Sequence, residues 1–205
     1  MKRAFSVDNV FSAKFSVIPF DGDWKDGFGC PELAGTWINY GRVKNGKTDF
    51  TMKLSKYMTN FGRVLYNSVE EGLSLSIQEA YSRNNMKDVA GKFILSNKES
   101  FEEIIERLNR HKSPNIIVID TVQFWEISFK QYKQLKAMFP QKLFIYVSHE
   151  KGSLPEGSVA QKIYRDANIA TRIEGFRAFP VGRYGGGEYI NISKEKAEKY
   201  WFLKQ

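Results

Sequence analysis

The chain has 205 residues, of which 42% are hydrophobic and 26% charged. This composition is typical of one globular domain with a well-buried core. One cysteine and two histidines exclude an internal disulfide and argue against a structural zinc site. The net charge of +8 and the isoelectric point near 9.4 favour polyanionic partners, nucleic acid or a nucleotide. We find neither a signal peptide nor an apolar run long enough to span a membrane, so we expect a cytoplasmic protein without membrane contact.

Aromatic residues punctuate the first 34 residues without a steady period, at Phe5, Phe11, Phe15, Phe20, Trp24 and Phe28. We interpret residues 1–34 as an N-terminal arm packed on the core, with the aromatic rings as anchors. Two alternatives remain open for the arm, a subunit-docking segment and a base-stacking surface. Residues 1–205 are therefore expected to form one domain.

A phosphate-binding loop is predicted next. Residues 36–40 are β-branched and aromatic, as in a strand, and Gly41–Thr48 then matches the pattern G-x-x-x-x-G-K-[ST] in full. Gly41, Asn45 and Gly46 would supply backbone N–H groups around a phosphate, because glycine permits the turns that aim them inward. Lys47 would reach the β- and γ-phosphates of ATP, and the Thr48 hydroxyl would bind Mg²⁺. Apolar residues at helical spacing then predict a helix, at Phe50, Leu54, Tyr57 and Met58.

Strands and helices alternate regularly after this helix. Short apolar runs predict strands at 63–68, 92–95, 115–120 and 142–147. Between them, apolar residues at helical spacing predict helices, at Leu73, Ile77, Ala80 and Tyr81, at Phe101, Ile104, Ile105 and Leu108, and at Phe129, Tyr132, Leu135 and Phe139. Capping boxes support the last two helices, at Ser96/Glu99 or Ser100/Glu103 and at Ser128/Gln131. Such βαβ repetition predicts an α/β fold with a mostly parallel central sheet flanked by helices.

The pattern changes after residue 149. Residues 150–157 are predicted to form a polar loop and residues 159–165 a short helix. Residues 169–173, 176–179 and 188–192 are predicted strands. We expect them to form antiparallel hairpins at one edge of the sheet, with residues 185–187 as a flexible glycine turn.

Carboxylates at two strand ends indicate the catalytic chemistry. Asp120 ends an apolar strand, as the Mg²⁺-binding aspartate of a Walker B motif does, and Thr121 follows it where many ATPases carry a glutamate base. The base must then come from elsewhere. Glu70 and Glu71 follow an earlier strand at the sheet edge where open α/β folds bind ligands, although first-turn helix glutamates would look the same.

These motifs resemble the ATPase core of RecA-type proteins, nearest to the RadA/DnaB/KaiC branch. In that branch a glutamate follows the strand after the phosphate loop, as in residues 66–72, and the Walker B strand continues as in residues 119–123. A polar sensor residue ends the next strand, as at residues 146–149, and residues 181–185 resemble the Lys-Asn-Arg-Phe-Gly signature of RadA. The resemblance covers roughly residues 35–192. It implies a P-loop NTPase fold of RecA type.

The resemblance also implies roles for single residues. Glu70 would orient and deprotonate the attacking water, His149 would sense the γ-phosphate, and Arg183 would act as an arginine finger on a neighbouring subunit of a homo-oligomer. Val181 departs from the family, because it stands where RadA has the signature lysine. Without an amino-terminal zinc finger or a carboxy-terminal protease-like domain, the chain looks like a stand-alone core from a phage or mobile element.

The expected function is Mg²⁺-dependent ATP binding and hydrolysis coupled to DNA, single-stranded DNA in particular, in recombination, repair or replication. The segments after Asp120 and His149 correspond to the DNA-binding loops of RecA-type proteins, where Phe124 and Trp125 could stack on bases. The alternative is a regulatory ATPase switch that binds a protein. A small-molecule phosphotransferase is disfavoured, because we recognise no motif for an acceptor substrate.

Overall fold

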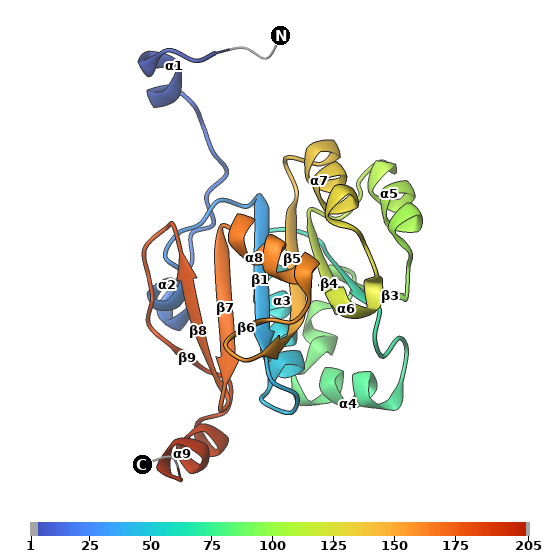
Figure 1. Ribbon diagram of the computed structural model, residues 1–205, viewed down its shortest axis with the longest axis vertical. Helices are drawn as coiled ribbons and strands as arrows, with labels where there is room; N and C mark the ends of the chain where they lie inside the picture. The colour runs from blue at the N-terminus through green and yellow to red at the C-terminus, as the bar shows by residue number, and fades with distance from the viewer. Residues whose placement is uncertain (1–3, 204–205) are drawn as a thin grey trace.

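The structure is a computed structural model that describes residues 4–203. One twisted sheet runs through the middle of the molecule, with strands in the order β3-β2-β4-β5-β1-β7-β8-β9 (Figure 1). The six strands from β3 to β7 are parallel, and β8 and β9 are antiparallel additions at the edge. Their bounds are β1 Gly35–Gly41, β2 Val64–Ser68, β3 Phe93–Asn97, β4 Ile116–Asp120, β5 Leu143–Lys151, β7 Ile169–Glu174, β8 Arg177–Gly182 and β9 Ile190–Asn191.

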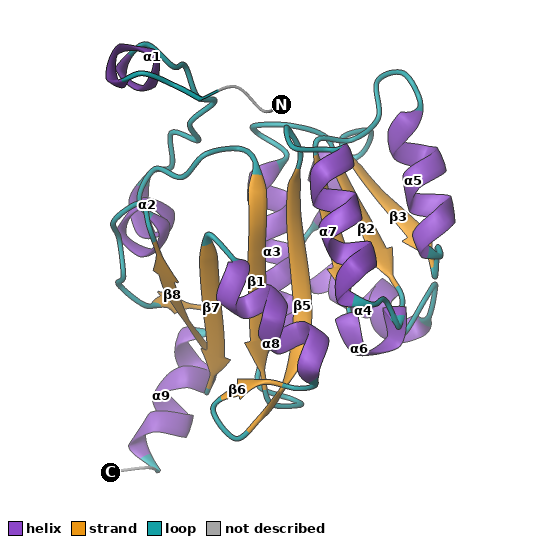
Figure 2. Cartoon of the chain, turned by 45° about the horizontal axis from the view of Figure 1, so that its top comes forward, coloured by secondary structure: helices purple, strands orange, loops and turns teal. Residues whose placement is uncertain are grey.

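Helices cover both faces of this sheet and make a three-layer α/β fold of the RecA-like P-loop class (Figure 2). One face packs α2 (Gly22–Phe28), α3 (Lys47–Met58) and α4 (Leu75–Arg83). The other packs α5 (Phe101–Asn109), α6 (Val122–Trp125), α7 (Phe129–Met138) and α8 (Ser158–Asp166). The central strands are buried on both faces, which explains their almost purely apolar sequences.

Local sequence signals set most helix boundaries. Ser74, Ser100 and Ser128 cap α4, α5 and α7, and the last two form complete capping boxes. The Ser100 box is therefore the correct one of the two predicted alternatives. Leu73 belongs to no helix, and its side chain is exposed.

The structure corrects the prediction in the region after residue 149. The expected loop at 150–157 is largely a hairpin, in which the end of β5 pairs with β6 (Leu154–Pro155) across a turn containing Gly152. β7 pairs in parallel with β1, so of the three strands predicted for the edge hairpins only β8 and β9 are antiparallel additions. A C-terminal helix that we did not predict, α9 (Lys194–Phe202), starts at a Ser193 cap.

The glycine turn at residues 185–187 is held against α2 instead of hanging free. The backbone N–H of Gly187 donates to the Gly27 carbonyl at 2.9 Å, and that of Glu188 donates to the Asp26 carbonyl at 3.1 Å. A Cβ on Gly29 would lie 2.1 Å from the Tyr184 carbonyl oxygen, so only glycine permits this close approach.

The N-terminal segment divides into two parts. Phe20 and Phe28 are buried in the core and Trp24 packs against it, as expected for anchors. Phe5, Phe11 and Phe15 are exposed, and α1 (Val7–Phe11) stands away from the body at the end of an extended segment (Figure 1). Packing on the core therefore starts near residue 17.

Candidate functional site

The phosphate loop joins the end of β1 to the start of α3. A Cβ on Gly41 would lie 2.3 Å from the Ile173 carbonyl oxygen, so only glycine fits between β1 and β7. Gly46 has φ +96° and serves as the N-cap of α3, which begins at Lys47. The first amide N–H groups of a helix lack intrahelical partners, so this 12-residue helix offers donors and a partial positive charge at the loop.

Six of the predicted site residues line one cavity of about 380 Å³, namely Gly46, Lys47, Thr48, Glu70, Asp120 and His149. They meet because β1, β2, β4 and β5 are parallel neighbours whose carboxyl ends reach the same edge of the sheet. Gly41 lies level with His149, and Ser68, two residues before Glu70, lies level with Asp120. Gly41 and Asn45 do not line the cavity.

Asn45 holds the loop in place. Its Oδ1 accepts from the Gly175 N–H at 2.9 Å, and its Nδ2 donates to the Val43 carbonyl at 3.1 Å. The side chain thus ties the loop to the β7–β8 turn, and any contact of Asn45 with phosphate is left to its backbone.

The surroundings of Asp120 disfavour the charged form of its carboxyl group. Burial, helped by the nearby carboxylates of Glu70 and Glu71, raises the pKa of its carboxyl to about 6, although a hydrogen bond from Tyr66 and the charge of Lys47 act to lower it. The fully buried Tyr66 donates its hydroxyl to Asp120 Oδ2. Asp120 is therefore held in one orientation by a residue that we did not predict.

Glu70 and its neighbour Glu71 make different contacts at the cavity. Glu70 Oε2 lies 3.3 Å from His149 Nε2 and accepts from the Thr121 hydroxyl at 3.2 Å. Glu71 also lines the cavity, but it accepts from Ser76 at the start of α4 and is more exposed. His149 Nδ1 is buried and has no hydrogen-bond partner within residues 4–203.

Lys47 and Thr48 complete the site. Burial lowers the pKa of the Lys47 ammonium, while Asp120, Glu70 and Glu150 act in the opposite direction. Lys47 Nζ donates to the Arg42 carbonyl at 3.1 Å. The Thr48 hydroxyl and the Asp120 carboxylate are oxygen donors on one cavity, which suits Mg²⁺, and the negative charge of Glu70 and Glu71 nearby would favour a cation.

Gln123, which sequence analysis missed, connects this site to the β5–β6 hairpin. Its amide nitrogen donates to Ser148 Oγ at 2.8 Å and to the Glu156 carbonyl at 2.7 Å. Its amide oxygen accepts from the His149 N–H at 3.2 Å. Three bonds at one side chain thus fix the strand end that carries His149.

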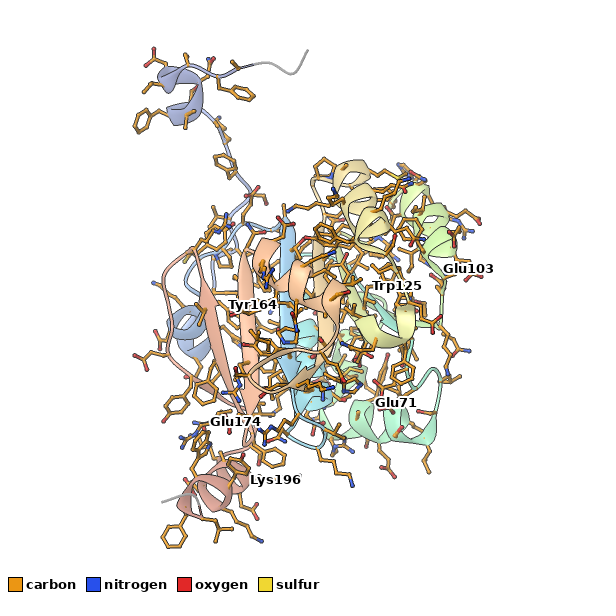
Figure 3. The ribbon with its side chains drawn as sticks, in the orientation of Figure 1. Glu71, Glu103, Trp125, Tyr164, Glu174 and Lys196 are labelled. Carbon is orange, nitrogen blue, oxygen red and sulfur yellow. The ribbon has the colours of Figure 1, made fainter. Side chains whose placement is uncertain are left out.

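Two further residues, from the C-terminal part of the chain, also line the cavity. The Phe176 ring packs beside Gly46, and Lys196 Nζ on α9 lies 5.3 Å from its centroid. Figure 3 shows Lys196 on α9 and Glu71 near α4, at the same end of the sheet. Phe176 and Lys196 come after the parallel strands in the sequence, and no motif marks them.

Arg183 lies away from this cavity. Gly182 is level with Ile169 and so with Trp37, at the opposite end of β1 from Gly41. Arg183 is exposed and lines a different cavity, of about 650 Å³, on the open face of β7 and β8. Within one chain the arginine is therefore not part of the site.

The two aromatic residues predicted to stack on bases differ in exposure. Phe124 is 53% exposed, and its ring centroid lies 6.3 Å from that of His149. Trp125 is buried, and its Nε1 donates to the Glu99 carbonyl at 3.0 Å (Figure 3). The prediction that Trp125 stacks on bases is wrong, because its ring fills the core under α6.

Comparison with known proteins supports the fold. No protein-family model matches the chain, and neither does any curated protein. Among solved structures, the flagellar accessory protein FlaH from Methanocaldococcus jannaschii superposes with a TM-score of 0.61 over 88% of this chain and 96% of that chain, at 19% identity. This similarity establishes the RecA-like fold.

Within residues 4–203, no helix is long and apolar enough to cross a membrane. In the same part of the chain, no group of three or more His, Cys, Asp or Glu side chains is placed to hold a metal ion.

Proposed function

We propose that the chain binds Mg²⁺ and ATP in the phosphate-loop cavity and hydrolyses the ATP. One observation carries the proposal: Lys47, Thr48, Glu70, Asp120 and His149, from four separate segments, line the same cavity. Chance would not bring a complete phosphate-loop pattern together with a strand-end aspartate and a histidine-paired glutamate.

The proposed mechanism assigns one task to each group. Loop N–H groups and Lys47 hold the β- and γ-phosphates, and Thr48 and Asp120 hold the metal. When bound, Mg²⁺ offsets the negative charge that develops on the phosphates. Glu70 orients a water molecule and takes its proton as the water oxygen attacks the γ-phosphorus, and the bond to the β–γ bridging oxygen breaks. His149, 3.3 Å from Glu70, is placed to respond to the γ-phosphate and to report it to the hairpin.

Replacing the loop lysine tests the proposal. Lys47→Ala should abolish measurable ATP turnover, because it removes the cation that reaches the phosphates, and should leave the unfolding temperature close to that of the parent. Lys194→Ala, which removes an equal charge from an exposed position on α9, is the matched control and should turn over like the parent. Unchanged turnover in Lys47→Ala would show that ATP is hydrolysed elsewhere or not at all.

We also propose that the protein acts on DNA and couples ATP hydrolysis to that action. We further propose that the chain belongs to the RadA/DnaB/KaiC-like branch. The exposed Phe124 on α6 and the exposed Lys151 and Leu154 of the β5–β6 hairpin support the proposed action on DNA. Both segments adjoin Gln123, through which DNA could influence His149.

A second candidate is a regulatory ATPase switch that binds a protein. The similarity to a flagellar accessory protein favours this alternative. Stimulation of turnover by single-stranded DNA, together with salt-dependent DNA binding, would support the first candidate. Turnover that DNA leaves unchanged would support the second.

A further inference from the structure

The exposed helices α7 and α8 carry a disproportionate share of the positive charge. Their 19 residues hold five cations, Lys130, Lys133, Lys136, Lys162 and Arg165, and one acidic residue, Asp166. Their net charge is thus +4, half of the +8 of the whole chain. The two helices lie on the same face of the sheet, which makes this one surface (Figure 1).

The acidic residue does not neutralise this surface. Asp166 accepts from Lys136 Nζ at 2.7 Å and also from the Tyr132 hydroxyl, so it is already paired. Within residues 4–203, Lys130, Lys133, Lys162 and Arg165 form no ion pair with a carboxylate. We call these four residues the α7–α8 basic surface.

Two of its cations converge from different helices. Lys133 Nζ on α7 lies 5.4 Å from the Phe129 ring centroid, and Lys162 Nζ on α8 lies 5.5 Å from it. The two ammonium groups are therefore within about 11 Å of each other. Like charges at such a separation repel when no anion lies between them, so an anionic ligand would be favoured here.

The composition of the surface identifies the kind of polyanion. A membrane-binding surface carries large apolar side chains beside its cations, but the only exposed large hydrophobic residue of α7 and α8 is Met138. The core of a protein–protein interface is depleted in lysine. A cationic surface without apolar insertions fits the phosphate backbone of a nucleic acid.

We infer that single-stranded DNA runs over the α7–α8 basic surface, held through its phosphates. This deepens the proposed action on DNA by locating a binding surface outside the loops that follow Asp120 and His149. α7 begins four residues after α6 ends, and α8 begins three residues after β6 ends. A DNA strand bound on the α7–α8 basic surface would therefore continue toward Phe124 and the β5–β6 hairpin.

Fluorescence anisotropy with a labelled oligothymidylate, without ATP and at several salt concentrations, tests this inference. The quadruple variant Lys130→Ala, Lys133→Ala, Lys162→Ala and Arg165→Ala should bind the oligonucleotide more than about tenfold more weakly than the parent. The slope of log K against log[salt] should also be less steep by roughly 3, because each lost phosphate contact reduces the slope by about 0.7. The matched control, Lys25→Ala, Lys87→Ala, Lys194→Ala and Lys199→Ala, loses the same charge from exposed sites elsewhere and should bind like the parent.

Three outcomes would overturn the inference: equal loss of binding in both quadruple variants, parental binding in the α7–α8 variant, or binding of the parent to phosphatidylserine vesicles but not to the oligonucleotide. Melting curves show whether the variants fold. Because the assay contains no ATP, its failure is distinguishable from failure of the ATPase proposal, which Lys47→Ala tests.

Discussion

Glu70 and Glu71 are adjacent in sequence but face different partners. Glu70 contacts His149 and Thr121 at the cavity, whereas Glu71 accepts from Ser76 on α4. Glu70→Gln keeps the shape of the side chain and loses the base, so ATP should still bind while turnover falls by roughly 10² or more. Turnover assays and nucleotide binding check this, with Glu71→Gln as the control. Loss of turnover in Glu71→Gln alone would reverse the assignment.

Asp120 should lower the stability of the metal-free protein. The folded-state pKa of about 6 lies above the ordinary value of 3.8, so between these pH values the folded state binds more protons than the unfolded state. The contribution of Asp120 to the free energy of unfolding therefore falls as pH rises from about 4 through 6, and at pH 7 it is still lower than near pH 4. Asp120→Asn should raise the free energy of unfolding at pH 7 by on the order of 1–3 kcal/mol, because it removes the charge and can still accept from Tyr66.

Urea unfolding with a chelator present, at pH 7 and near pH 4, measures this effect. The gain should vanish near pH 4, where the folded wild type already has a protonated Asp120. The same variant should weaken Mg²⁺-dependent ATP binding, because it loses the carboxylate that would hold the metal. A variant no more stable than the parent at pH 7 would show that the carboxylate is not destabilised.

Sequence could predict a residue of the site only where the residue belongs to a continuous motif. Lys47 and Asp120 are marked by their neighbours, and the structure brings them to one cavity. Tyr66 was not predictable, because its bond to Asp120 depends on the parallel pairing of β2 with β4. The expectation that Trp125 is exposed is wrong, since the four-residue helix α6 turns its ring into the core.

At the level of elements, Gln123 joins α6 to the β5–β6 hairpin. Gln123→Ala would leave the Glu156 carbonyl and the His149 N–H without this partner, which costs about 1–3 kcal/mol for each group that remains buried. We expect faster amide exchange in residues 148–156, lower turnover and unchanged ATP affinity. Hydrogen exchange by mass spectrometry and steady-state kinetics measure these changes.

Gln123→Glu provides the conservative control. It keeps an oxygen that can accept from His149 but loses the donors to Ser148 and Glu156, so its exchange rates and turnover should be intermediate. Parental exchange and turnover in Gln123→Ala would show that the hairpin is fixed independently of this side chain.

Elements with strong local signals were predictable, and those that depend on distant partners were not. α7 has an apolar stripe and a complete capping box, and sequence located it well. Most residues of the β5–β6 hairpin are polar, so its ladder leaves no regular apolar pattern to detect. α9 buries only Ala197 and has a weak stripe, although Ser193 could have marked its start.

At the scale of the whole molecule, strand order determines which residues can meet. The sequence predicted a parallel sheet, but not that β1 would lie between β5 and β7. This order places the loop beside His149 on one side and against Ile173 on the other. The same order carries Arg183, which directly follows β8, to the far end of the sheet, a separation that no local pattern could show.

The position of Arg183 leads to a prediction about assembly. Gly182 lies four residue steps along the strands from the level of Gly41, roughly 13 Å, and two strands away from β1. The turn beyond Arg183 is held on α2, so it cannot swing to the loop of its own chain. If Arg183 acts on ATP, it must act on the ATP of a neighbouring subunit. Specific activity should then rise with protein concentration as oligomers form, which turnover assays and light scattering measure together.

A mixing experiment separates action between subunits from a general need for assembly. Arg183→Ala subunits keep an intact loop, and Lys47→Ala subunits keep an intact arginine. A mixed interface can therefore unite the loop of one with the arginine of the other. Mixing the two inactive variants should restore part of the turnover, while Lys47→Ala mixed with further Lys47→Ala should restore none. Parental turnover by Arg183→Ala alone, or full activity of a monomer at every concentration, would leave Arg183 a surface residue with no part in hydrolysis.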